Sequence, residues 1–412
     1  AVNRACELVE MLGAGEVMDG MIDVLNYVPQ PVTVKLEPER INALLGTDIP
    51  EADMIEYLRR EEVPVMDGMI QVPSWRPDLR VMADIAEEVA RYYGYNNIET
   101  TLMRGATTMG GYSDAQKLEN AAGAAARAMG YSEIITYSFI SPSYYDKIRL
   151  PADSPLRNSM KILNPLGEDT SIMRTTILPS MLEILTRNYN YRNKAVRLYE
   201  IGKVYFARPD GMADEPKLLC LGGYGGGMDF FQLKGAVERI LAGLRITDVT
   251  FEAEHDNPSY HPGRCAKVYA GGKLLGVLGQ IHPLAAANYG VDAELYTAEL
   301  WLGELLAARG ATPVYTPLPR FPAVTRDIAI VCAADIPVAK LSACILAAGG
   351  QYLKGCELFD VYTGAPIPVG YKSVAFSLTL RADDQTLTDD HAEETMQSVL
   401  KALKETFNAT IR

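Results

Sequence analysis

The chain has 412 residues, of which 48% are hydrophobic and 22% are charged. Both fractions are ordinary for globular proteins and exclude a disordered, collagen-like or coiled-coil chain. At about one domain per ~150 residues, the length predicts two to four domains. No apolar run approaches the ~20 residues that cross a bilayer, and acids stand near the start where a secretory signal has an apolar core. We therefore expect a cytoplasmic protein without a membrane segment.

The formal net charge of −13 is concentrated near the N-terminus. Residues 1–109 hold 9 basic and 19 acidic residues, a net of −10, whereas residues 110–312 and 318–412 are close to neutral. This asymmetry indicates separate modules. Because no module is basic, attraction of the whole protein to phosphates is not expected to drive binding. Any nucleic acid would have to be recognised locally, through base stacking and hydrogen bonds.

Residues 32–100 are the first compact unit that the pattern predicts. In chain order this unit contains a short strand, two helices, a hairpin centred on Asp67-Gly68 and a third helix over residues 79–93. An Asp-Gly pair between two β-prone runs is a strong hairpin signal. We interpret this combination of helices and a hairpin as a small winged-helix-like module.

Residues 113–312 alternate helices and strands after a linker over residues 101–112. An alanine-rich helix over residues 114–129 is followed by a β-prone run at 133–141, and later strands are joined without regular crossover helices. This order predicts an antiparallel α+β core and not a doubly wound sheet. The glycines within residues 222–227 match no phosphate-binding motif, so we interpret them as a strand edge and a wide turn.

A proline-rich linker over residues 313–322 precedes the last module. The predicted order of this module is strand, helix, strand, strand, helix, strand, with helices over residues 337–348 and 389–406. That βαββαβ order is typical of the ferredoxin-like fold. Thr388 is expected to cap the second helix. The fold class predicted for the whole chain is therefore α+β with several domains.

A cluster of acidic residues in and before the helix over residues 79–93 is a candidate metal site. Asp84, Glu87 and Glu88 are three and four residues apart, which places them on one helix face, and Asp78 lies just before the helix. Carboxylate oxygens are ligands that Mg²⁺ prefers. From the spacing alone a solvated acidic face is the favoured alternative, because runs of charge are usually solvated.

Asp360 and Tyr362 are candidate nucleic-acid contacts near the end of a strand in the last module. Strand alternation places both on one face, opposite to Phe359 and Val361. An exposed tyrosine on a ferredoxin-like sheet can stack on an unpaired base. The alternative is an ordinary surface tyrosine at a strand end, since isolated exposed aromatic residues are common.

The chain resembles the C-terminal half of the β subunit of bacterial phenylalanyl-tRNA synthetases. The resemblance runs through nearly all of residues 30–412 and rests on segments in the family's order, among them VPSWRPDL, DIAEEVARYYGYNNI, ILNPLGEDTSIMRTTILPSML, RLYEIGKVY, DFFQLKG, HPGRCA, GVLGQIHP, RFPAVTRDIAIV, LFDVYTG and KSVAFSLTLR. With the family's N-terminal OB-fold and most of its editing domain missing, we expect a fragment. The resemblance implies a remnant of the editing domain at 1–27, a winged-helix-like module at 28–100, a catalytically inactive class II synthetase-like core at 101–312, a linker at 313–317 and a ferredoxin-fold anticodon-binding domain at 318–412.

The resemblance also implies partners and roles. The family's β subunit pairs with a catalytic α subunit, which binds ATP and phenylalanine, in an (αβ)₂ heterotetramer that charges tRNA(Phe). This chain is then expected to supply no catalytic residue, since residues 110–312 lack the glycine-rich, arginine-ending motif that holds ATP in such active sites. The implied ligands of a Mg²⁺ shared with α are Asp78, Asp84, Glu87 and Glu88. The residues implied to contact anticodon bases are Asp360, Tyr362 and Ser373.

Two alternatives to an accessory subunit are open at this point. In the first, residues 110–312 form a stand-alone class II-like ligase in which Arg174 and Glu200 hold a carboxylate or a nucleotide. In the second, residues 32–100 act as a nucleic-acid-binding module, which the net negative charge of this part of the chain opposes. Tight ATP binding by the chain alone would favour the first alternative.

Overall fold

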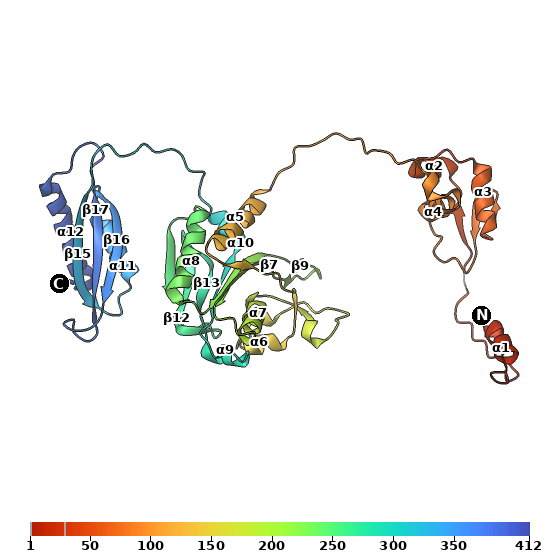
Figure 1. Ribbon diagram of the computed structural model, residues 1–412, viewed down its shortest axis with the longest axis horizontal. Coiled ribbons are helices and arrows are strands. Elements are labelled where there is room, and N and C mark those ends of the chain that lie inside the picture. Colours follow the sequence, from red (N-terminus) through yellow and green to blue (C-terminus); the bar gives the residue numbers. More distant parts are fainter. Residues whose placement is uncertain (1, 29) are drawn as a thin grey trace. The chain divides into compact units, whose positions relative to one another are not determined.

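The computed structural model describes every residue except 1 and 29. It divides into two compact units, Ala1–Gly111 and Tyr112–Arg412, which are described separately (Figure 1). The first unit contains helices and one sheet, and the second contains helices and several sheets, so the chain is a mixed α+β protein as predicted. Within the described residues, no helix is both long and apolar enough to cross a membrane.

The first unit is built around a three-stranded antiparallel sheet in the order β1–β3–β2. Its elements are α1 (Val2–Met11), β1 (Val32–Lys35), α2 (Pro38–Leu45), α3 (Glu51–Arg60), β2 (Val65–Met66), β3 (Met69–Val72), α4 (Met82–Tyr93) and the 3₁₀ helix η1 (Tyr95–Asn97). Ile41, Leu58 and Ile85, one from each of α2, α3 and α4, are fully buried in one core. Asp67 and Gly68 have φ angles of 50° and 74°, as a tight two-residue hairpin turn requires, so the predicted hairpin is confirmed.

The middle of the chain carries a seven-stranded sheet in the order β11–β12–β13–β14–β10–β7–β4. Neighbouring strands are antiparallel except for β4 and β7, which are parallel. The strands are β4 (Ser132–Glu133), β7 (Val196–Lys203), β10 (Lys217–Tyr224), β11 (Val249–Ala253), β12 (Tyr260–Ala270), β13 (Lys273–Ile281) and β14 (Tyr296–Trp301). The antiparallel arrangement predicted for this region is therefore observed.

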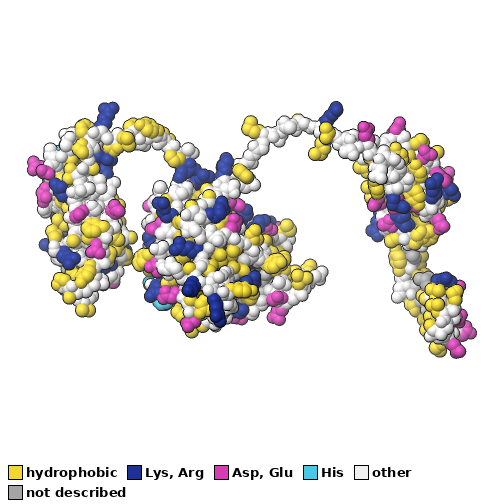
Figure 2. All heavy atoms as spheres, in the orientation of Figure 1, with side chains coloured by type: hydrophobic (Ala, Val, Ile, Leu, Met, Phe, Trp, Pro, Cys, Tyr) yellow, Lys and Arg dark blue, Asp and Glu magenta, His cyan; other side chains and the backbone are white. Residues whose placement is uncertain are grey.

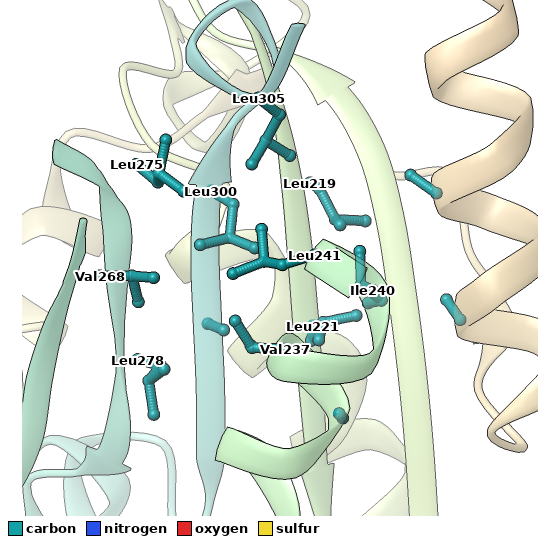
Figure 3. Close-up of a cluster of buried hydrophobic side chains, with 14 of the residues drawn as sticks. Leu219, Leu221, Val237, Ile240, Leu241, Val268, Leu275, Leu278, Leu300 and Leu305 are labelled. Carbon is teal, nitrogen blue, oxygen red and sulfur yellow. The ribbon is translucent and has the colours of Figure 1, made fainter. Parts of the chain in front are cut away.

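Helices cover both faces of this sheet. They are α5 (Asp114–Ala128), α6 (Ser143–Lys147), α7 (Leu178–Asn190), α8 (Phe230–Gly243), α9 (Pro283–Asn288) and α10 (Leu302–Ala308). Strand β10 divides its residues between two cores: Leu219 and Leu221 pack with α5, α8 and α10, whereas Leu218 and Cys220 pack with α6, α7 and α9. Figure 3 shows the first core, where strand leucines meet Val237 and its neighbours on α8.

The β-prone run at residues 133–141 is not the single strand that the sequence predicts. Its start joins the large sheet as β4, and its end, β5 (Phe139–Ile140), pairs with β6 (Ile172–Met173). Between them, Ile135 and Tyr137 are 92% and 80% exposed. The remaining short elements are β8 (Phe206–Ala207), β9 (Ala213–Asp214) and the 3₁₀ helices η2 (Pro155–Arg157) and η3 (Glu168–Thr170).

The glycine cluster forms a strand end and a turn, as predicted. Strand β10 ends at Tyr224, and Gly225, Gly226 and Gly227 follow with φ angles of 67°, 58° and 77°. Residues with a side chain rarely adopt such angles. The turn leads into α8, where the carboxylate of Asp229 caps the helix by accepting a hydrogen bond from the backbone N–H of Gln232.

The C-terminal module has the predicted βαββαβ order. Its elements are β15 (Val324–Ala333), α11 (Val338–Ala348), β16 (Leu353–Tyr362), β17 (Tyr371–Leu380), α12 (Asp389–Phe407) and β18 (Thr410–Ile411). The antiparallel sheet has the order β16–β17–β15–β18, and both helices contribute to one core against it. The hydroxyl of Thr388 accepts a hydrogen bond from the backbone of His391, which confirms the predicted cap of α12.

Candidate functional site

The sheet of the C-terminal module has one face covered by helices and one open face. Phe376 of β17 is fully buried in the core shared with α11 and α12, so Ser373 and Ala375 face the other side because side chains alternate along a strand. Cross-strand partners point to the same face, and β16 places Tyr362 opposite Ser373 and Asp360 opposite Ala375. The structure therefore brings all three predicted anticodon-binding residues onto the open face.

A β-bulge decides which residues of β16 reach that face. The register shifts between Leu358 and Asp360, which leaves Phe359 without a partner on β17. Before the shift, Glu357 lies on the open face. If the strand had no bulge at Phe359, the alternation of side chains that continues from Glu357 would point Asp360 and Tyr362 toward the helices.

Tyr362 is held in place on the open face by its hydroxyl group. The hydroxyl donates a hydrogen bond of 2.8 Å to the carbonyl oxygen of Ala365, and the guanidinium carbon of Arg412 lies 5.5 Å from the ring centroid. The residue is still 38% exposed, whereas Ser373 is only 3% exposed. A fixed aromatic ring beside the carboxylate of Asp360 can stack on one base while the carboxylate accepts a hydrogen bond from a base edge.

The predicted metal ligands on α4 have separate partners. Asp84 caps the helix: its Oδ2 accepts hydrogen bonds from the backbone N–H groups of Arg80 at 2.7 Å and Val81 at 2.8 Å. These backbone bonds lower the pKa of Asp84. Glu87 is exposed to solvent, whereas Glu88 is buried. The three residues are therefore not one solvated acidic face.

Arginines hold the other two predicted ligands. Arg76 donates hydrogen bonds to Asp78 at 2.7 Å and to Glu88 at 2.5 Å, and also to Glu61 at 3.0 Å. Arg91 donates to the second carboxylate oxygen of Glu88 at 2.6 Å. The bond from Arg76 lowers the pKa of Asp78. The acidic cluster is thus part of an ion-pair network.

This network leaves few oxygen atoms for a cation. In the described part of the chain, no group of three or more Asp, Glu, His or Cys side chains is arranged to hold a metal ion. Carboxylates have the right chemistry for Mg²⁺. As arranged in this chain alone, however, the four predicted ligands do not fit a Mg²⁺ site, because the two oxygens of Glu88 and one oxygen of Asp84 already accept hydrogen bonds.

Arg174 and Glu200, considered above for substrate binding, form a buried ion pair in the middle module. Nη2 of Arg174 donates to Oε1 of Glu200 at 2.8 Å, and the side chains are 2% and 3% exposed. The hydroxyl of Thr136 accepts from Nη1 of Arg174 and donates to Oε2 of Glu200, each at 2.7 Å. Because both charged groups are covered and bonded to each other, neither is free to hold a nucleotide.

Glu299 of β14 is a chemically distinctive residue that the sequence reasoning missed. Its Oε1 accepts hydrogen bonds from the backbone N–H groups of Ile177 at 2.8 Å and Leu178 at 3.1 Å, at the start of α7. Burial raises the pKa of Glu299. The available signal was a single acidic residue inside the otherwise uncharged strand YTAELW.

Three family models match successive parts of the chain. They are described as the tRNA synthetase B5 domain at residues 34–95, the phenylalanyl tRNA synthetase beta chain CLM domain at residues 98–302 and the ferredoxin-fold anticodon binding domain at residues 319–412. Together they account for most of the chain and include both modules of the second unit.

Curated relatives match along the whole chain. The phenylalanine--tRNA ligase beta subunit of Clostridium tetani is 41% identical over 418 residues, which cover 100% of this chain and 53% of the relative. The protein of the same description from Moorella thermoacetica is 42% identical over 429 residues, which cover 100% of this chain and 53% of that relative. The chain therefore spans about half the length of the curated relatives it matches.

Proposed function

The chain belongs to the family of phenylalanine--tRNA ligase beta subunits, and we propose that it acts as a non-catalytic part of such a ligase. In this role it supports the ATP-dependent charging of tRNA(Phe) by an α subunit and binds the anticodon. The observation that carries the proposal is the open sheet face on which Asp360 and Tyr362 are exposed beside the buried Ser373, in a module that matches an anticodon-binding family.

The open face recognises bases and not phosphates under this proposal. The ring of Tyr362 stacks on an unpaired anticodon base, and the carboxylate of Asp360 accepts a hydrogen bond from a base N–H group. Figure 2 shows acidic and basic side chains interspersed on the visible face of the C-terminal module. Because the chain has a net charge of −13, neutralisation of phosphates would have to come from other parts of the ligase.

The middle module serves as a class II synthetase-like scaffold that packs against α in an (αβ)₂ assembly. Four large apolar residues in its loops are the candidate contacts with such a partner, because an apolar side chain that becomes buried in an interface stabilises the association. These residues, all at least 80% exposed, are Ile135, Tyr137, Leu163 and Leu166. The winged-helix-like module of residues 28–100 belongs to the same scaffold.

Two features oppose the rival functions. A stand-alone ligase would need Arg174 and Glu200 to contact substrate, yet they are buried against each other. A nucleic-acid-binding role for residues 32–100 is opposed by the acidic character of the first 109 residues, which would repel phosphates. The accessory role is the function that the geometry supports best.

In this proposal the cofactors ATP and Mg²⁺ bind only to the assembled ligase. ATP is used by the α subunit, in the cytoplasm, and no catalytic residue is assigned to this chain. The Mg²⁺ predicted at Asp78, Asp84, Glu87 and Glu88 stays a proposal for the assembled ligase, since these residues do not fit a Mg²⁺ site in this chain alone. We likewise propose the domain boundaries given above, which divide the chain into residues 1–27, 28–100, 101–312, 313–317 and 318–412.

The test is tRNA(Phe) binding by the chain co-purified with an α subunit. Tyr362→Ala should weaken binding by about 1–3 kcal/mol, roughly 5- to 150-fold, because one stacked base is lost. Tyr362→Phe keeps the ring and should retain most of the affinity. Tyr95→Ala, which removes an exposed tyrosine of the first unit, is the matched control. Unchanged affinity for Tyr362→Ala in a folded module, or failure to co-purify with α, would contradict the proposal.

A further inference from the structure

A cavity of about 320 Å³ lies in the middle module, on the sheet face that also contacts α7. This volume is at the lower end of the range for small-molecule sites. Strands β10, β12, β13 and β14 form its floor, and residues 148–178 form part of its wall. Its apolar lining includes Leu150, Leu156, Leu218, Leu274, Val277 and Trp301. Nothing in the accessory role proposed above uses this space.

The sheet register places opposite charges on either side of this cavity floor. Lys267 of β12 lies opposite Val277 of β13, which in turn lies opposite Glu299 of β14. Residues in such a row point to the same face, and their strands are about 4.8 Å apart. All three residues line the cavity. Lys267 already pairs with the buried carboxylate of Glu254, so it is not available to a ligand.

Glu299 has unused hydrogen-bonding capacity. Its Oε1 accepts hydrogen bonds from two backbone N–H groups and lies 2.8 Å from the hydroxyl of Thr176, whereas the only hydrogen-bond partner of Oε2 among the described residues is the same hydroxyl, at 2.9 Å. A threonine hydroxyl has a single hydrogen, so it cannot fully satisfy both oxygens. Oε2 therefore retains an acceptor position in a cavity with largely apolar walls.

The charges of the lining do not cancel. Glu254, Lys267 and Glu299 together carry one net negative charge when all are ionised. A carboxylate without a salt-bridge partner beside apolar walls is costly, and burial raises the pKa of Glu299 although Thr176, the helix amides and Arg174 favour its ionised form. A single positive charge delivered with an apolar group would satisfy both the carboxylate and the walls.

We propose that this cavity binds a small organic monocation, a protonated amine that carries an apolar group. The ammonium donates a hydrogen bond to Oε2 of Glu299, and the apolar group packs against Val277 and the leucines of the wall. The site is separate from the open sheet face of the C-terminal module and does not depend on anticodon binding.

The probe is 2-phenylethylammonium, titrated into the 412-residue chain by calorimetry, with 2-phenylethanol as the neutral comparison. An ammonium group makes a stronger, charge-assisted hydrogen bond to a carboxylate than a hydroxyl group does, so the amine should bind at least tenfold more tightly than the alcohol. Glu299→Gln keeps an acceptor for the helix amides but removes the charge, and it should abolish this preference. Glu252→Gln is the control, since Glu252 lies opposite Lys267 on the neighbouring strand β11 but is exposed and does not line the cavity.

A second variant keeps the test decisive if Glu299→Gln is unstable. Val277→Phe fills the cavity without altering the hydrogen bonds of Glu299, and it should reduce amine affinity at least tenfold. Unchanged amine binding in Val277→Phe, equal binding of amine and alcohol to the unmodified chain, or no detectable binding of the amine would overturn the proposal.

Discussion

Replacing Glu200 by glutamine should strongly destabilise the middle module. The substitution preserves the size of the side chain but leaves the guanidinium of Arg174 buried without a counter-charge. The two side chains are 2.8 Å apart and at most 3% exposed. Removal of one partner of a buried ion pair costs about 3–5 kcal/mol. At roughly 2–4 °C per kcal/mol for a module of this size, the melting temperature should fall by about 6–20 °C.

The assay is calorimetric unfolding of the chain, with a second ion pair of the same module as control. Lys203 and Glu215 are 2.6 Å apart, but their side chains are 45% and 44% exposed. Solvent-exposed pairs contribute about 0–1 kcal/mol. Glu215→Gln should therefore shift the transition only slightly.

A double substitution separates burial of charge from loss of packing. Arg174→Met combined with Glu200→Leu removes both charges, so it should be less destabilising than Glu200→Gln alone. If Glu200→Gln costs no more than Glu215→Gln, the pair is effectively solvated. That result would refute the argument that Arg174 and Glu200 are unavailable to a ligand.

Three further outcomes are expected. Asp84→Ala should lower the stability of the first unit at pH 7 but not near pH 2. The lowered pKa of Asp84 stabilises the fold at pH values above the ordinary pKa of 3.8, and this contribution is lost as the pH falls. Urea unfolding at both pH values measures the free energy of unfolding. The raised pKa of Glu299 should make the middle module less stable as the pH rises above 4.5, and Glu299→Gln should flatten that dependence in thermal unfolding from pH 4 to 8. Mg²⁺ should not bind at α4 of the isolated chain, because arginines hold Glu88; broadening of α4 amide signals by Mn²⁺ would contradict this expectation.

Local patterns were sufficient to predict much of the fold. The hairpin at Asp67-Gly68, the cap at Thr388 and the βαββαβ order all depend on turn chemistry and on periods of two or 3.6 residues. Each of these signals lies within a few neighbouring residues. The run at 133–141 was predicted less well, because its two ends pair with different strands and pairing is not a local property.

Interactions between distant residues were not predictable in this way. Glu299 accepts hydrogen bonds from Ile177 and Leu178, more than 120 residues earlier in the chain. Glu88 appeared to be part of an acidic helix face, but Arg76 and Arg91 neutralise it in the folded unit. In both cases the chemistry of a carboxylate depends on partners that only folding brings close.

The open sheet face of the C-terminal module shows the same division. Alternation with a period of two was enough to determine that Asp360 and Tyr362 share one face of their strand. Which face they share depends on how β16 pairs with β17, because one unpaired residue, Phe359, reverses the alternation relative to Glu357. That bulge exists only when the partner strand is in register, so the tertiary structure decided that these side chains point away from the helices and are exposed to solvent.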